Sequence, residues 1–128
     1  MPQQGQTERV ALVPVLFALA SCSYAGSLTL GVLVGSRRVD SSGFHWLHHA
    51  LYASTFALAA VTAGVALLAA PLGIRVARGD ATVGWVLLPA LVAFALIPFL
   101  GTRGRRHPVV GVVPVPLYLL ALAALVAR

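Results

Sequence analysis

The chain of 128 residues has very few charged side chains. Asp, Glu, Lys and Arg together make up 9% of the residues, whereas a soluble domain usually carries about a quarter. Hydrophobic residues account for 59%, which leaves too little polar surface to cover a water-soluble fold. The scarcity of charge therefore excludes an ordinary soluble domain and indicates that lipid surrounds much of the chain.

Cysteine is limited to Cys22, so an intrachain disulfide is excluded. The segment 19–22, Leu-Ala-Ser-Cys, resembles the bacterial lipoprotein motif, in which a lipidated cysteine follows the cleavage site. The apolar run continues well past Cys22, however, where a lipoprotein would begin a polar tether. We therefore interpret Cys22 as a buried residue of a helix rich in small side chains.

Acidic residues are limited to Glu8, Asp40 and Asp80. They lie far apart in the sequence, so it shows no pair of carboxylates for general acid and base catalysis. It also lacks a Gly-rich phosphate loop and any spacing that suits a Ser-His-Asp or Cys-His arrangement. No apolar run contains a charged residue, which argues against a proton relay, a pump or a secondary transporter. We therefore expect no enzymatic activity from the chain itself.

Lysine is absent, and nine arginines give a net charge of +6. The arginines lie at the chain ends or in the short gaps between apolar runs, not over one soluble face. This placement is typical of residues that flank membrane helices, and anionic lipid headgroups are their natural counter-charge. We therefore expect membrane lipids, and not nucleic acid, as partners of these charges.

Long apolar runs, by contrast, are abundant, at residues 10–34, 44–70, 83–100 and 108–127. Each run is long enough to cross the roughly 30 Å hydrocarbon core as a helix. The sequence therefore predicts an all-α fold with a single membrane domain over residues 1–128, an integral membrane bundle of four transmembrane helices with up-down topology. Trp46 and Trp85 lie near predicted helix starts, as interfacial aromatic residues do. We expect Ser41 or Ser42 to cap the second helix.

The composition also suggests a location. Ala, Val, Leu, Gly and Arg dominate and Lys is missing, a bias typical of GC-rich bacterial genomes. We therefore expect a multi-pass protein of the bacterial inner membrane.

Prolines interrupt several of these runs. Pro89 and Pro98 predict a kink in the third helix, because each removes a backbone hydrogen bond. Pro114 and Pro116 predict local unwinding in the fourth. The carbonyl groups that these prolines leave without donors have to find partners inside the bundle, since lipid offers none.

Small residues recur at four-residue spacing in the first helix and at spacings of four, three and four in the second. The first stripe consists of Ser23, Ser27, Gly31 and Gly35, and the second of Ala53, Ala57, Ala60 and Gly64. Such stripes allow helix backbones to approach closely within a membrane. Two interpretations are open: the stripes pack against each other, or one of them packs against a helix of another membrane subunit or of a second copy.

The histidines are predicted to share one membrane surface, because the second and fourth helices start on the same side. His45, His48 and His49 open the second helix, and His107 precedes the fourth. His45 and His49 share a helix face, since they are four residues apart. The connections on this side carry five arginines: Arg37, Arg38, Arg103, Arg105 and Arg106.

Three interpretations are open for this surface. The histidines can be interfacial residues that bind lipid, water or loop backbone. They can hold a metal ion, or haem b between two helices, for example through His48 and His107. The arginines and the helix N-termini can instead bind an anionic lipid or a quinone headgroup.

These patterns favour a small multi-pass membrane protein that acts as a non-enzymatic accessory or scaffold subunit and packs with partner helices. The first alternative is a haem- or metal-binding electron-transfer subunit that uses the histidines. The second is a protein that binds anionic lipid or quinone at the arginine and histidine surface.

Overall fold

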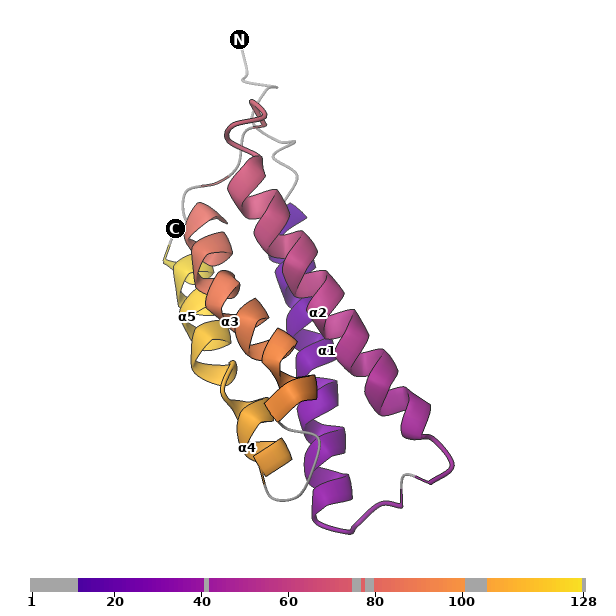
Figure 1. Cartoon of the computed structure of the whole chain (residues 1–128). Helices are drawn as coiled ribbons and strands as arrows, with labels where there is room; N and C mark the ends of the chain where they lie inside the picture. Colours follow the sequence, from indigo (N-terminus) through magenta and orange to yellow (C-terminus); the bar gives the residue numbers. More distant parts are fainter. Residues whose placement is uncertain (1–11, 41, 75–76, 78–79, 101–105, 128) are drawn as a thin grey trace.

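A computed structural model describes residues 12–40, 42–74, 77, 80–100 and 106–127, and the backbone alone for 106–108. These residues form α1 (Leu12–Gly35), α2 (His45–Leu68), α3 (Asp80–Leu100), α4 (Arg106–Val112) and α5 (Val115–Val126). α4 and α5 follow each other as two parts of one span (Figure 1). Each of the four spans is long and apolar enough to cross a membrane, which confirms the predicted all-α bundle.

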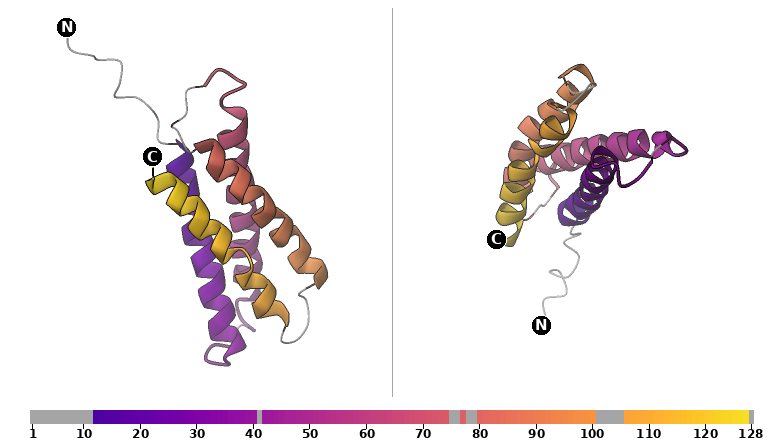
Figure 2. Two further views of the ribbon diagram at one scale, coloured as in Figure 1. Left: turned by 90° about the vertical axis from the view of Figure 1, so that its left-hand side faces the viewer. Right: turned by 90° about the horizontal axis from the view of Figure 1, so that it is seen from below.

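Successive spans run in alternating directions (Figure 1). α1 packs along α2, α2 along α3, and α3 along α5. Aromatic side chains link α1 to α5, where the ring of Phe17 stacks on Tyr118 with 5.6 Å between centroids. The first turns of α2 project away from the other helices, as Figure 2 shows from below. The bundle is therefore closed at the end where α1 begins and α5 ends, and open at the opposite end.

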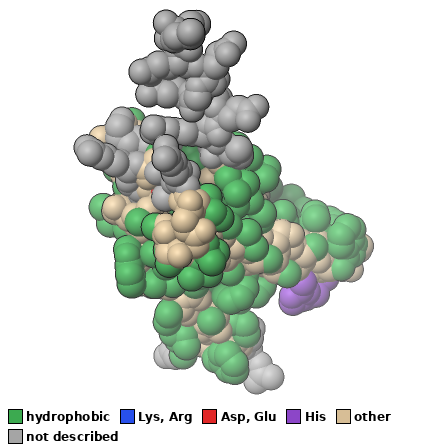
Figure 3. All heavy atoms as spheres, turned by 90° about the horizontal axis from the view of Figure 1, so that it is seen from above, with side chains coloured by type: hydrophobic (Ala, Val, Ile, Leu, Met, Phe, Trp, Pro, Cys, Tyr) green, Lys and Arg blue, Asp and Glu red, His purple; other side chains and the backbone are tan. Residues whose placement is uncertain are grey.

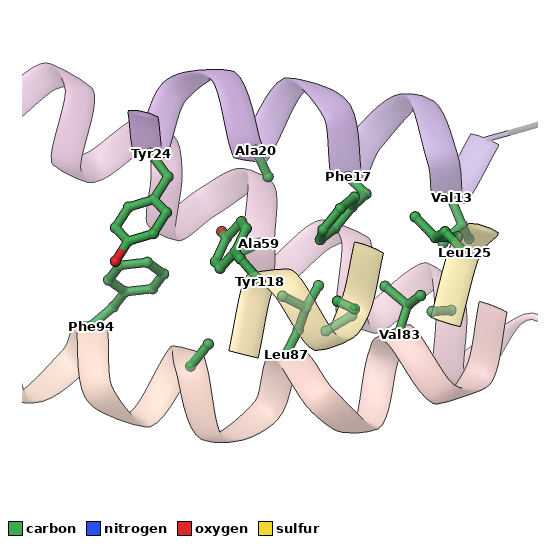
Figure 4. Close-up of a cluster of buried hydrophobic side chains, with 14 residues drawn as sticks. Val13, Phe17, Ala20, Tyr24, Ala59, Val83, Leu87, Phe94, Tyr118 and Leu125 are labelled. Atoms are coloured by element: carbon green, nitrogen blue, oxygen red, sulfur yellow. The ribbon is translucent and has the colours of Figure 1, made fainter. Parts of the chain in front are cut away.

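The core lies at the closed end and in the middle of the bundle. Buried residues of α1 recur at spacings of three and four, and they face buried side chains of α3 and α5 (Figure 4). The labelled members of this cluster are Val13, Phe17, Ala20, Tyr24, Ala59, Val83, Leu87, Phe94, Tyr118 and Leu125. Within the apolar stretch of each span only 17–33% of the residues are buried. Most apolar side chains therefore face outward, where lipid can surround them.

Two tyrosines supply donors to carbonyl groups beside the prolines. Pro98 has no N–H, so the carbonyl of Phe94, four residues earlier, loses its helical donor. The hydroxyl of Tyr52 in α2 donates to this carbonyl at 2.6 Å. The hydroxyl of Tyr24 in α1 donates to the carbonyl of Gly111 at 2.6 Å, at the end of α4. These bonds tie α2 to α3 and α1 to α4.

The break between α4 and α5 follows from the prolines, as the sequence predicts. Pro114 has no N–H to offer to the carbonyl of Val110, which instead accepts from the N–H of Val113 in a tighter turn at 3.3 Å. Pro114 then occupies the N-cap of α5, and its carbonyl accepts from the N–H of Tyr118 at 3.0 Å. The fourth span is thus two short helices joined by a proline turn.

α2 and α3 pack closely at Gly84, which is buried. A Cβ atom placed on Gly84 would lie 2.7 Å from Cγ of Leu67 and 3.1 Å from Cβ of Ala66. A Cβ atom placed on Gly64 of α2 would have no heavy atom of another described element within 4 Å. The two glycines therefore differ in their packing although both lie inside helices.

We expect Tyr52→Phe and Tyr24→Phe each to lower the free energy of unfolding by about 0.5–2 kcal/mol, because each leaves a carbonyl inside the bundle without a donor. Tyr118→Phe is the matched control, since the hydroxyl of Tyr118 is buried with no partner among the described residues. Its removal should be neutral or stabilising. Unfolding of the three variants in detergent measures the difference, and equal destabilisation by all three would contradict it.

We expect Gly84→Ala to destabilise the bundle by about 1–3 kcal/mol, because α2 and α3 have to move apart to admit the methyl group. Gly64→Ala adds the same atom in open space and should be neutral or slightly stabilising through its higher helix propensity. Thermal unfolding in one detergent compares the two. If the Gly84→Ala variant is as stable as Gly64→Ala, the close approach of α2 and α3 does not contribute to stability.

Candidate functional site

The open end of the bundle contains the connection from α1 to α2, with Arg37 and Arg38 at its start. The N–H of Arg38 donates to the carbonyl of Leu33 at 3.0 Å, and the N–H of Arg37 donates to Val34 at 3.0 Å. Arg37 has a φ of 57°, the left-handed conformation that usually selects glycine at this position of a helix end. Both arginines are exposed, and their charges lie at the negative end of the α1 dipole.

Asp40 lies in the same connection and is fully exposed. Its carboxylate accepts from the backbone N–H of Ser42 at 3.0 Å and from the hydroxyl of Ser42 at 3.0 Å. The backbone hydrogen bond, followed by the hydroxyl bond, lowers the pKa of Asp40 below its ordinary value. Asp40 therefore keeps its negative charge, and it lines an open hollow together with Val34, Arg37 and Val39. Its carboxylate offsets the charge of Arg37 there, which disfavours an anion inside the hollow.

The predicted cap of α2 by Ser42 is wrong. Phe44 occupies the N-cap position and makes no side-chain hydrogen bond, because Ser42 is engaged with Asp40. Ser41 lies outside the described residues. The N-cap of α2 lies two residues after Ser42, so the Ser42 hydroxyl belongs to the turn at Asp40 and not to the helix end.

His45 and His49 lie side by side on the first turns of α2. Their Nε2 atoms are 3.1 Å apart, and their ring centroids are 4.8 Å apart with the rings edge to face. One ring donates and the other accepts, so the pair shares a single proton between the two nitrogens. Both side chains are exposed, and the histidines are visible on the projecting end of α2 in Figure 3.

His48 is half-buried, and its ring centroid lies 6.1 Å from that of His49. His107 is the second residue of α4, which starts at the same end of the bundle as α2 (Figure 1). The side chain of His107 lies outside the described part of the chain, as do Arg103, Arg105 and the side chain of Arg106. The possible haem ligation by His48 and His107 therefore stays a prediction, as does an anion site that includes these arginines.

Among the described residues, no group of three or more His, Cys, Asp or Glu is placed to hold a metal ion. His45 and His49 are suited to neighbouring positions on one metal rather than to opposite sides of a haem. With metal–nitrogen bonds of about 2 Å, two nitrogens on opposite sides of a metal are about 4 Å apart, whereas the Nε2 atoms of His45 and His49 are 3.1 Å apart. Moreover, a porphyrin between two residues one helical turn apart would run into α2.

The small-residue stripes have different surroundings in the structure. Ser23 donates to the carbonyl of Leu51 at 3.3 Å and lies 2.9 Å from the hydroxyl of Thr55, so it joins α1 to α2. The α2 face in this contact carries Thr55, not Ala53 or Ala57, which are exposed. The first stripe therefore does not pack against the whole of the second stripe.

The glycines of the stripes face open space. A Cβ atom built on Gly31, Gly35 or Gly64 would have no heavy atom within 4 Å outside its own helix. Ser27 and Ala60 are half-buried. Gly31 and Gly35 lie seven and eleven residues after Tyr24, so they continue the face of α1 that is buried at the closed end. Within the part of the chain that the structure describes, this face is therefore uncovered beside Gly31 and Gly35.

Two features escaped the sequence analysis. Asp80 is the first residue of α3 and is buried, with its carboxylate accepting from the N–H of Ala77 at 2.9 Å. In the sequence Asp80 follows Gly79 and precedes an apolar run, a position that could have indicated the start of the third helix. Cys22, which we expected to be buried, is exposed on α1. The helix continues beyond it to Gly35, so the segment resembling a lipoprotein motif lies within a membrane span.

These features define a small multi-pass membrane protein in which Arg37, Arg38, Asp40 and the histidines of α2 lie at one end. No protein-family model matches the chain, and neither a curated protein nor a solved structure shows significant similarity to it. Its function therefore has to be argued from the geometry.

Proposed function

We propose that the chain is a non-enzymatic accessory or scaffold subunit of a membrane assembly, in which a partner helix covers the open face of α1. The observation that carries this proposal is the empty space beside Gly31 and Gly35 on a face that is buried elsewhere in the same helix.

The uncovered face is suited to a helix because of its small side chains. In lipid no hydrophobic effect drives two helices together, so close backbone packing has to stabilise the contact. Glycines without neighbours allow another backbone to approach, whereas the flexible tail of a lipid gains less from a narrow groove. The partner is a helix of another membrane protein or of a second copy of this chain.

Interhelical polar contacts near the same face support this proposal. Ser23 and Thr55 already join α1 to α2 at 2.9 Å, and Ser23 lies eight residues, about two turns, before Gly31. Ser27 lies between them and Gly31 on the same stripe, where a partner helix can reach its hydroxyl.

We expect Gly31→Leu and Gly35→Leu to abolish association without unfolding the chain, because each leucine enters space that is open in the single chain. The measurement is purification from the native membrane in mild detergent, with mass spectrometry of every protein retained and of the oligomeric state. Ala25→Leu is the matched control, since Ala25 is exposed on a different face of α1. A wild-type chain recovered as a monomer without other proteins would overturn the proposal, as would leucine variants that keep the partner.

Binding of anionic lipid is a second candidate function, favoured by the two exposed arginines at the end of α1. We expect the double variant Arg37→Gln with Arg38→Gln to bind vesicles or micelles of anionic lipid more weakly, by about 1 kcal/mol for each arginine removed. Zwitterionic lipid is the control, because it offers no net charge. Equal lipid retention by the variant and the wild type would remove this candidate.

A further inference from the structure

We propose that His45 and His49 form a two-nitrogen chelate for a divalent first-row transition metal, such as Cu²⁺, Ni²⁺ or Zn²⁺. The site lies on the exposed end of α2, and it is independent of the helix packing proposed above.

The separation of the two nitrogens matches the bite of one metal ion. Metal–nitrogen bonds to histidine are about 2.0–2.1 Å long. Two such bonds at angles between about 90° and 109° place the nitrogens about 2.8–3.4 Å apart. The Nε2 atoms of His45 and His49 are 3.1 Å apart, so their separation already fits one metal ion, and a metal can replace the shared proton once the rings turn to direct both nitrogens at it.

The helix holds this geometry in advance. Residues four apart lie one above the other on a helix, and the two Nε2 atoms here already lie 3.1 Å apart. Both ligands belong to one helix, so the chelate forms without ordering a loop. Neutral imidazole selects borderline metals, whereas Ca²⁺ and Mg²⁺ prefer oxygen ligands.

Two electrostatic effects of opposite sign act on a cation at the start of α2. The positive end of the helix dipole opposes it, but solvent screens this effect because both side chains are exposed. An anionic membrane surface concentrates divalent cations in the same layer. The two protein ligands leave further coordination positions to water, so the bound metal exchanges with solvent rather than forming a closed structural site.

Titration of the full chain in detergent micelles with Cu²⁺ tests the proposal. Trp46 lies next to His45 and is 68% exposed, so Cu²⁺ bound at the pair should quench its fluorescence. The background from Trp85 is removed with Trp85→Phe. Electron paramagnetic resonance of the same sample should show two nitrogen ligands on copper. Mg²⁺ should cause no quenching.

His45→Ala and His49→Ala should each weaken Cu²⁺ binding more than about tenfold, because a chelate becomes a single ligand. His48→Ala is the matched control, because it removes one histidine, as the other two variants do, but keeps the His45 and His49 pair. Its affinity for Cu²⁺ should stay within about twofold of the wild type. Unfolding temperatures without metal establish that the variants are folded. The proposal is overturned if His48→Ala loses as much affinity as His49→Ala, or if the wild type shows one nitrogen ligand or none.

Discussion

A backbone carbonyl inside a membrane has no water to replace a lost helical donor, and this chain places prolines within its spans. The hydroxyl of Tyr52 reaches the carbonyl that Pro98 leaves without a donor, and the hydroxyl of Tyr24 reaches Gly111 beside the break in the fourth span. Both bonds run between helices, so satisfying the backbone also sets which helices adjoin. The prolines therefore determine tertiary contacts as well as local bends.

The distribution of polar groups follows from the way the helices diverge. Among the described residues, large apolar side chains fill the interior near the start of α1 and the end of α5, whereas Gly31, Gly35, Arg37, Arg38 and the histidines of α2 lie at the opposite end. A helix pair that is tightly packed at one end and open at the other exposes different chemistry to the two membrane surfaces. Both proposed partners, a helix beside Gly31 and a metal at His45 and His49, belong to the open end.

The number and class of the helices were predictable because length and composition alone decide whether a segment can cross a bilayer. The proximity of His45 and His49 was also predictable, since residues four apart meet within one helix. The tyrosine contacts were not, because they join residues 42 and 87 positions apart and depend on the rotation of each helix. The outward direction of Ala53 and Ala57 escaped prediction for a similar reason: spacing identifies a stripe but not what lies opposite it.

Unequal helix lengths have a consequence for how the chain fits a bilayer. α1 and α2 contain 24 residues each and α3 contains 21, which correspond to about 36 Å and about 32 Å of rise. Helices of different length can cross one slab of lipid when the longer ones tilt more or extend their ends beyond the hydrocarbon. α1 and α2 therefore match a thicker hydrocarbon layer than α3 does, and a change of tilt lets one bundle fit lipid layers of different thickness.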